Sequence, residues 1–178
     1  MKSIFYQQLE RSTAHRKCRD DLMFLALGNS VFLEELFEVA LNINDKNHYK
    51  ACWVLELVLM EKLELIEPHL DIFLTILSNY SHHGALRSIS KIVMMLSRSK
   101  NIELEKKQKE ILIENCFLWL SLSPKVATKA YAAYALRNFG KENQEILPLL
   151  YEILEQDYSK FTAAYKAMAR DVMKGKDF

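Results

Sequence analysis

Apolar residues recur along the chain three and four positions apart, the spacing that places them on one face of an α-helix. Short polar or glycine-containing segments separate these runs, and the alternation typical of a β-strand never persists. The pattern predicts roughly ten helices, over residues 3–16, 19–27, 30–41, 48–61, 67–78, 85–96, 103–122, 124–139, 143–154 and 160–173. We therefore expect an all-α protein.

Particular residues mark the expected helix ends. Ser3 and Ser30 are predicted to cap helix N-termini, and Gly28 is predicted to end a helix. Pro68 and Pro148 fall in predicted first turns, where the missing backbone N–H would be unpaired in any case. Residues 97–110 are polar and charged, so we expect a loop followed by the exposed first turns of the next helix.

One helical segment, residues 128–140, is repeated elsewhere in the chain. Residues 162–169 match residues 128–135 at five of eight positions, 34 residues later. The run Ala51-Cys52-Trp53-Val54-Leu55 follows the same order as residues 132–136: two small residues, an aromatic residue and two apolar ones. Self-similarity of this kind is typical of stacked helical repeats.

The repeated segments resemble HEAT and armadillo-like repeats. Ile146-Leu147-Pro148-Leu149-Leu150 is similar to the first helix of a HEAT repeat. Residues 128–140 are similar to the second helix, with Thr128 and Lys129 ahead of spaced alanines, a leucine and Gly140. The resemblance implies one domain over residues 1–178, a short right-handed α-solenoid of about five helix pairs. These pairs are an N-terminal pair over 3–28 and repeats over about 30–61, 67–97, 103–140 and 143–174.

More narrowly, the chain resembles short bacterial HEAT-like proteins, some of which carry the name adenylosuccinate lyase. The lyase superfamily has a serine-rich loop followed by a Met-Pro-x-Lys-x-Asn-Pro run, and this chain has no counterpart of either. The residues therefore give no support to lyase activity, and we predict a protein that is not an enzyme.

Composition and charge narrow the function classes. The chain has 24 Lys and Arg against 23 Asp and Glu, a net charge of +1, which argues against strong nonspecific binding to nucleic acid. No stretch approaches the ~20 apolar residues that span a bilayer. Cys18, Cys52 and Cys116 are odd in number and widely spaced, so we expect free thiols, mostly buried, in a cytoplasmic protein.

The residue types needed for catalysis or metal binding do not form a recognisable set. His15 and Cys18 lie one helical turn apart, but a zinc site needs three or four protein ligands. The pair His82 and His83 falls in a predicted turn and is expected to face water. The four glycines are isolated, so no phosphate-binding loop is present. We predict no catalytic residue, cofactor or metal.

Aromatic and basic residues gather in the C-terminal half, which has 15 basic and 11 acidic side chains after residue 90. Its tyrosines fit either of two roles: gripping a peptide or stacking bases, or filling the space opposite an alanine face. Our candidate partner-binding residues are Lys129, Arg137, Lys166, Arg170, Arg87 and Lys91. We predict a scaffold that binds a protein or peptide on its concave face; the alternative is nucleic-acid binding or alkylated-DNA repair through the basic half.

Overall fold

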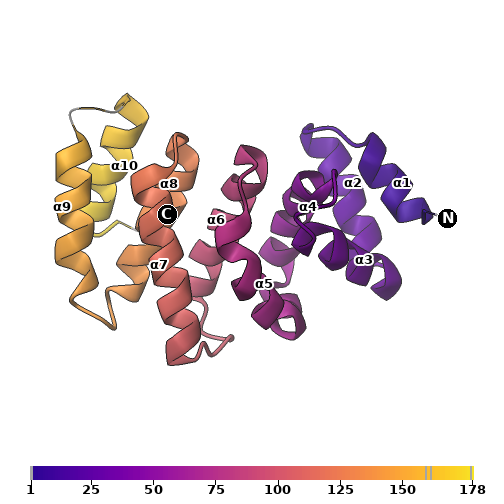
Figure 1. Cartoon of the computed structure of the whole chain (residues 1–178), viewed down its shortest axis with the longest axis horizontal. Helices are drawn as coiled ribbons and strands as arrows, with labels where there is room; N and C mark the ends of the chain where they lie inside the picture. The colour runs from indigo at the N-terminus through magenta and orange to yellow at the C-terminus, as the bar shows by residue number, and fades with distance from the viewer. Residues whose placement is uncertain (1, 159, 161, 177) are drawn as a thin grey trace. The chain divides into compact units, whose positions relative to one another are not determined.

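The computed structural model describes residues 2–158, 160, 162–176 and 178, and this part of the chain contains no strand. It forms ten α-helices and two short 3₁₀ helices (Figure 1). The α-helices are α1 (Ile4–Arg11), α2 (Arg16–Leu27), α3 (Ser30–Leu41), α4 (His48–Glu61), α5 (Leu70–Ile76), α6 (His83–Arg98), α7 (Lys106–Leu122), α8 (Val126–Phe139), α9 (Ile146–Tyr158) and α10 (Ala163–Met173). The 3₁₀ helices are η1 (Leu63–His69) and η2 (Leu77–Asn79). The predicted all-α class is confirmed.

The chain divides into two compact units, Met1–Ile92 and Val93–Phe178. In the first unit α3 packs on α4, and α2 packs on both. In the second unit α7 packs on α8, while α8, α9 and α10 pack on one another. Helices that are neighbours in sequence are therefore mostly neighbours in space. The assignment of residues 1–178 to one domain stays a prediction.

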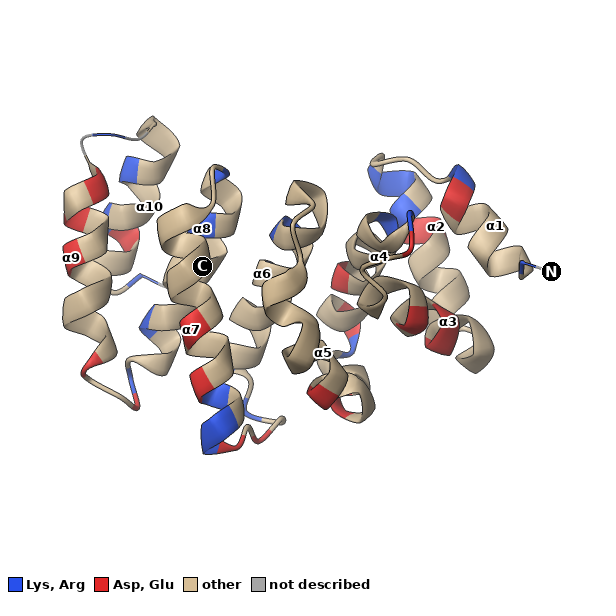
Figure 2. Cartoon of the chain, in the orientation of Figure 1, with Lys and Arg blue, Asp and Glu red and all other residues tan. Residues whose placement is uncertain are grey.

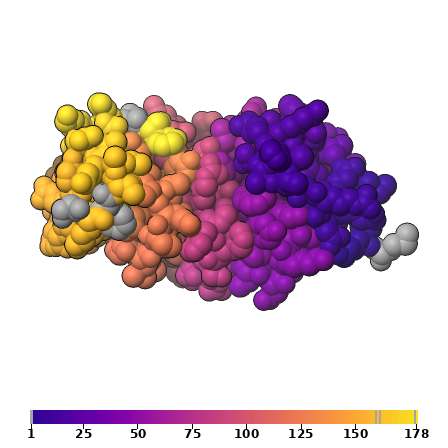
Figure 3. Space-filling model, turned by 90° about the horizontal axis from the view of Figure 1, so that it is seen from above, coloured from indigo at the N-terminus to yellow at the C-terminus, as the bar shows by residue number. Residues whose placement is uncertain are grey.

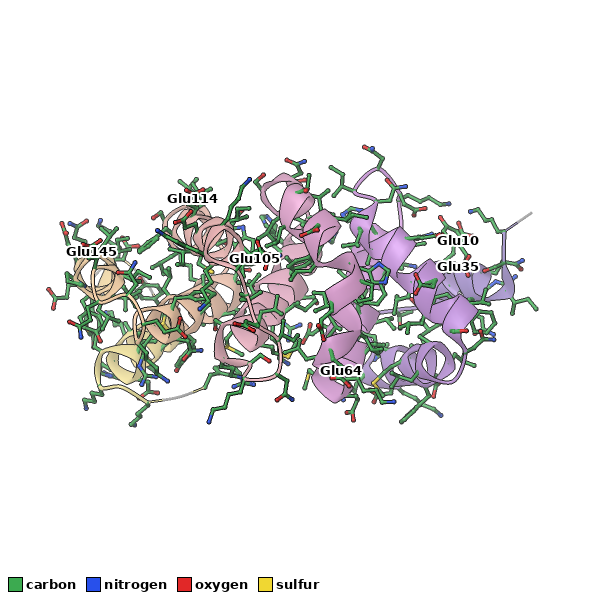
Figure 4. The ribbon with its side chains drawn as sticks, turned by 90° about the horizontal axis from the view of Figure 1, so that it is seen from below. Glu10, Glu35, Glu64, Glu105, Glu114 and Glu145 are labelled. Carbon is green, nitrogen blue, oxygen red and sulfur yellow. The ribbon has the colours of Figure 1, made fainter. Side chains whose placement is uncertain are left out.

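The first unit is built around α4. Every residue of α4 from Ala51 to Leu59 is buried except Trp53, which is half-buried. A helix that is apolar on nearly all sides is stable only when other helices surround it. The N-terminal helix α1 is held by two acids labelled in Figure 4: Lys46 Nζ lies 2.5 Å from Glu10 Oε1, and Ser3 Oγ donates to Glu35 Oε1 at 2.6 Å. Two hydrogen bonds lower the pKa of Glu10, the stronger effect coming from Lys46 and the weaker from Lys2.

The second unit is built around α8. Its alanines Ala132, Ala133 and Ala135 have no exposed surface. Side chains this small let α7, α9 and α10 come close, and close packing is what gives a protein interior its density. Gly140 ends α8, and a Cβ atom built there would lie 2.8 Å from Leu147 Cγ. The closing residues Phe139 and Gly140 are as predicted.

Several helix ends differ from the prediction. α1 ends at Arg11 and α2 begins at Arg16, because Ser12 turns to extended backbone and its Oγ donates to Leu9 O at 2.7 Å. Serine competes for backbone hydrogen bonds in this way. The N-cap of α3 is Asn29 rather than Ser30: its Oδ1 accepts from Val31 N and Phe32 N. Ser3 caps α1 as expected, since it accepts from Tyr6 N.

Other boundaries shift in the middle and at the end of the chain. Pro68 lies inside η1, so α5 begins two residues later, at Leu70. The loop before α7 and the basic first turn of α7 are as expected, and the turn is blue in Figure 2. α9 begins at Ile146 rather than 143 and runs to Tyr158, so the predicted turn at 157–159 begins inside it, and Ser159 lies outside the described residues.

No helix in the described part of the chain has the length and apolarity needed to cross a membrane.

Candidate functional site

Two of the six predicted partner-binding cations, Arg87 and Lys91, converge on one carboxylate in the first unit. Glu56 of α4 is only 2% exposed, and its Oε1 lies 3.0 Å from Lys91 Nζ. Its Oε2 lies 3.2 Å from Arg87 Nη1 and accepts a hydrogen bond from Ser88 Oγ at 2.6 Å. Both cations therefore neutralise a buried charge between α4 and α6.

Sequence reasoning missed Glu56, although a signal for it was present. Glu56 is the one acid within the apolar run 51–59, and Ser88 and Lys91 stand where neighbouring repeats carry alanine or aromatic residues. A carboxylate buried in an apolar helix needs a charged or hydrogen-bonding partner. The unusual residues of α6 supply that partner.

The third predicted cation, Lys129, points into the second unit and is only 1% exposed. Its Nζ donates to the carbonyl oxygens of Leu120 and Ser121, in the last turn of α7, and lies 3.7 Å from Asp157 Oδ2. Burial lowers the pKa of Lys129, and the Asp157 carboxylate partly opposes this. In this position Lys129 joins α7, α8 and α9 within the unit and does not face solvent.

The remaining cations contact the end of α9 or the segment after α10. Arg137 donates to the carbonyl oxygens of Gly175 and Lys176, the latter at 2.7 Å. Lys166 Nζ lies 5.8 Å from the centre of the Tyr158 ring, and Arg170 Nη1 donates to Tyr158 Oη at 3.2 Å. Each of the six predicted cations thus contacts its own chain, and their role in partner binding stays a prediction.

Two hollows adjoin α8 in the second unit, and they meet at Asn138. The first, of about 250 Å³, is lined by Leu96, Ser97, Ser99, Lys100, Ile102, Glu103, Leu104, Lys109, Asn138, Phe139 and Glu142. The second, of about 190 Å³, is lined by Met94, Arg98, Tyr134, Asn138, Lys141 and Phe178. Asn138 Nδ2 donates to Ser97 Oγ at 3.0 Å and so joins α8 to the end of α6.

The two hollows differ in charge. In the first, Lys109 Nζ lies 2.5 Å from Glu142 Oε2, so a cation and an anion compensate each other at its rim. Among the described residues, the lining of the second hollow includes two cations, Arg98 and Lys141, and no acid. Burial raises the pKa of Tyr134, the nearby Asp171 adds to the rise and Arg137 opposes it, so Tyr134 presents a neutral hydroxyl.

The end of the chain returns to α8 and lies beside the second hollow. The ring of Phe178 makes edge contacts with the rings of Tyr131 and Tyr134, each at a centroid distance of 5.2 Å. Arg98 Nη1 donates to Phe178 O at 3.3 Å. The C-terminal marker over α8 in Figure 1 and the yellow atoms against orange ones in Figure 3 show the same placement. The tyrosines are largely buried among the helices, yet their edges hold an aromatic side chain.

The cysteine and histidine candidates lie apart from these hollows. All three cysteines are free: Cys52 and Cys116 are buried, as expected, and Cys18 is half-buried. Burial raises the pKa of the Cys52 thiol to about 12. His15 precedes α2, and Cys18 accepts from Thr13 Oγ1 at 3.6 Å. Within the described residues, no three His, Cys, Asp or Glu side chains are placed to hold a metal.

Comparison of the chain with models of known families, with curated proteins and with solved structures gave no match.

Proposed function

We propose that this protein is a non-enzymatic helical-repeat scaffold that binds a protein or peptide partner. The observation that carries the proposal is the pair of hollows that adjoin α8 and meet at Asn138. Two depressions that share a wall can hold consecutive parts of one extended chain. Cations, a tyrosine and an amide line them, and groups of these kinds recognise peptides through both backbone and side chains.

The architecture that we propose around this surface is a right-handed α-solenoid of HEAT type, with about five helix pairs. Helices that follow one another in sequence pack on one another within each unit, as such repeats require. In this arrangement α8 is the second helix of its pair, and the second helices line the concave face. The free thiols support the further proposal that the protein works in the cytoplasm.

Nucleic acid is the alternative partner, and the contacts of the basic residues favour it less. Lys166 and Arg170 both contact Tyr158, and Arg137 contacts backbone carbonyl groups. Phosphate binding would have to displace these contacts. It would also make the affinity fall steeply as salt rises.

Site-specific photo-crosslinking in the native cell tests the proposal. A photoreactive phenylalanine analogue replaces Lys141, which lines the second hollow, or Glu155, an exposed residue of α9 that serves as the control. We expect a protein adduct from position 141 that is absent from position 155 and lost on Arg98→Glu substitution. Equal adducts at both positions would contradict the proposal. A gel shift with DNA that weakens as salt rises would support the alternative.

A further inference from the structure

The segment after α10 is turned back toward α8 by its first glycine. Gly175 has φ of +79°, and no other described residue has positive φ. Gly175 N donates to Val172 O at 3.1 Å and Lys176 N donates to Asp171 O at 2.9 Å. These two bonds form a Schellman motif, which ends a helix and fixes the direction of the chain that follows. The tail segment is defined here as Gly175, Lys176 and Phe178.

The tail segment is held by both its backbone and its side chains. Arg137 donates to the carbonyl oxygens of Gly175 and Lys176, and Arg98 donates to that of Phe178. Lys176 Nζ lies 3.1 Å from Asp171 Oδ1, and the Phe178 ring contacts two tyrosines. The residues that make these contacts, which we call the tail site, are Arg98, Tyr131, Tyr134, Arg137 and Asp171.

This set of contacts is a recognition pattern rather than a single anchor. Arginines that bind carbonyl oxygens recognise any backbone, whereas Asp171 selects a cation and the tyrosines select an aromatic ring. The cation and the ring are two positions apart in the tail segment, at Lys176 and Phe178. The tail site therefore recognises a basic residue and, two positions later, an aromatic residue.

The tail segment leaves part of the tail site open. Phe178 is 58% exposed, and the hollow of about 190 Å³ lies beside its ring. A bulkier aromatic side chain would bury more apolar area in the same place. The chain's own residues thus fit the tail site without filling it.

We propose that the tail site binds a partner segment in which a basic residue stands two positions before an aromatic residue, and that the tail segment competes for it from within the same chain. This inference rests on the proposed function and names its partner chemistry and its control. A tethered segment acts at an effective concentration that can reach the millimolar range. A partner must therefore outcompete the tail segment, either with a larger aromatic residue or with additional contacts in the first hollow.

Fluorescence polarisation tests the competition. The probe is the fluorescein-labelled peptide Met-Lys-Gly-Lys-Asp-Phe, the sequence of residues 173–178, with an amide at its end so that Arg98 meets a carbonyl oxygen. It is titrated against the unchanged protein, against the double variant Lys176→Ala/Phe178→Ala, and against the matched control Lys174→Ala. Lys174 is exposed and lies immediately before the tail segment.

We expect the double variant to bind the probe at least tenfold more tightly than the unchanged protein, and the Lys174→Ala control to equal the unchanged protein. Adding Arg137→Ala to the double variant should weaken binding at least fivefold. A probe with Trp in place of Phe should bind about threefold more tightly, and one with Ala at least tenfold more weakly. Equal binding by the double variant and the unchanged protein would overturn the proposal, as would equal binding of the Phe and Ala probes.

A second measurement needs no variant and guards against misfolding. Excess unlabelled Trp-containing probe is added to the unchanged protein while the ring resonances of Phe178 are followed by NMR. Displacement predicts that these resonances move to the positions of a free peptide. Resonances that stay unchanged at saturating probe would overturn the proposal.

The two proposals fail in different ways. A protein adduct at position 141 without any probe binding would leave the scaffold function standing and remove the tail site. Probe binding and displacement without a protein adduct would leave the tail site standing and remove the scaffold function.

Discussion

Lys129 shows at the residue scale why a cation in a repeat motif need not be a binding residue. The last carbonyl groups of a helix have no partner within the helix and carry the negative end of its dipole. Lys129 Nζ donates to two such groups at the end of α7. The repeats at residues 51 and 162 lack a cation at the matching position, so this contact belongs to one helix pair and not to the repeat.

Replacing Lys129 with Met should lower the free energy of unfolding by about 1–3 kcal/mol, because buried carbonyl groups lose their donor. Lys160→Met is the control: Lys160 also lies near Asp157, at 3.6 Å, but is exposed, so the change should be within about 0.5 kcal/mol. Urea unfolding measures both variants. A Lys129→Met protein as stable as the unchanged one would contradict the inward position of this side chain.

The same lysine predicts a pH dependence. Its pKa in the folded protein is lowered from 10.5, so between these two values the unfolded chain binds more protons. Stability contributed by Lys129 therefore rises as pH rises through that interval. The difference in unfolding free energy between the unchanged protein and Lys129→Met should be larger at pH 10 than at pH 7. A difference that shrinks would mean that the folded pKa is raised.

His82 is a second residue whose protonation matters. Its Nδ1 accepts hydrogen bonds from Gly84 N at 3.1 Å and Ala85 N at 3.4 Å, so the neutral ring caps α6. Its ring also stacks on Tyr49, at a centroid distance of 4.2 Å. The prediction that His82 faces water is confirmed, since the residue is exposed. Its capping hydrogen bonds also explain why α6 begins at His83.

Burial lowers the pKa of His82, with contributions from the charges of His48 and His83. A lowered folded pKa means that the stability is present above pH 6.5 and is lost as pH falls below it. His82→Asn keeps a capping acceptor without titrating, whereas His82→Ala should cost about 1 kcal/mol at pH 7. Thermal melts from pH 7 to pH 5 should show a smaller loss for His82→Asn than for the unchanged protein. Parallel losses would exclude His82 as a titrating cap.

At the scale of helices, α4 and α6 are joined by the buried Glu56 cluster. Glu56→Ala should cost about 3–5 kcal/mol, because Lys91 is left near-buried without its carboxylate. Lys91→Met alone should also lower the free energy of unfolding. Combining it with Glu56→Ala should recover part of the stability that the single changes lose. A double-mutant cycle by urea unfolding measures the coupling, and strictly additive effects would argue against direct pairing.

Gly140 is required by packing between helices rather than by backbone conformation. Its φ of −65° suits any residue, but an added Cβ would lie 2.8 Å from Leu147 Cγ at the start of α9. Gly140→Ala should therefore destabilise the protein by about 1–3 kcal/mol. Gly28→Ala is the matched control at another helix end, where the nearest atom lies at 3.2 Å and no side chain intervenes. Equal melting temperatures for the two variants would contradict the close approach.

Helix cores were predictable from the sequence, whereas helix ends and the site were not. The apolar spacing that placed α3, α4 and α8 reflects burial of a whole face. By contrast, Ser12, Asn29 and His82 each set a boundary through one or two hydrogen bonds. Whether a cation points inward depends on which carbonyl or carboxylate group the partner helix offers. The tail site went unpredicted for the same reason, although Gly175 after α10 was a signal that the chain turns there.

At the scale of the whole chain, the boundary between the two units falls within a helix. α6 continues from residue 83 to residue 98, and Ile92 and Val93 on either side of the boundary are both fully buried. Flexible linkers between domains are exposed and are the usual sites of proteolysis. The boundary is therefore expected to resist protease, and the loop between α6 and α7, in which Lys100 is exposed, to be cut first.

Limited digestion with trypsin, followed by mass spectrometry, checks this expectation. The first cut should follow Lys100, which is exposed in that loop, and Lys100→Gln should slow it. The turn after α8 also exposes a lysine, Lys141, but backbone hydrogen bonds from residues 141, 142 and 143 hold it. Because cleavage needs local opening, bonded turns are cut more slowly. A first cut after Lys91, within α6, would contradict this expectation.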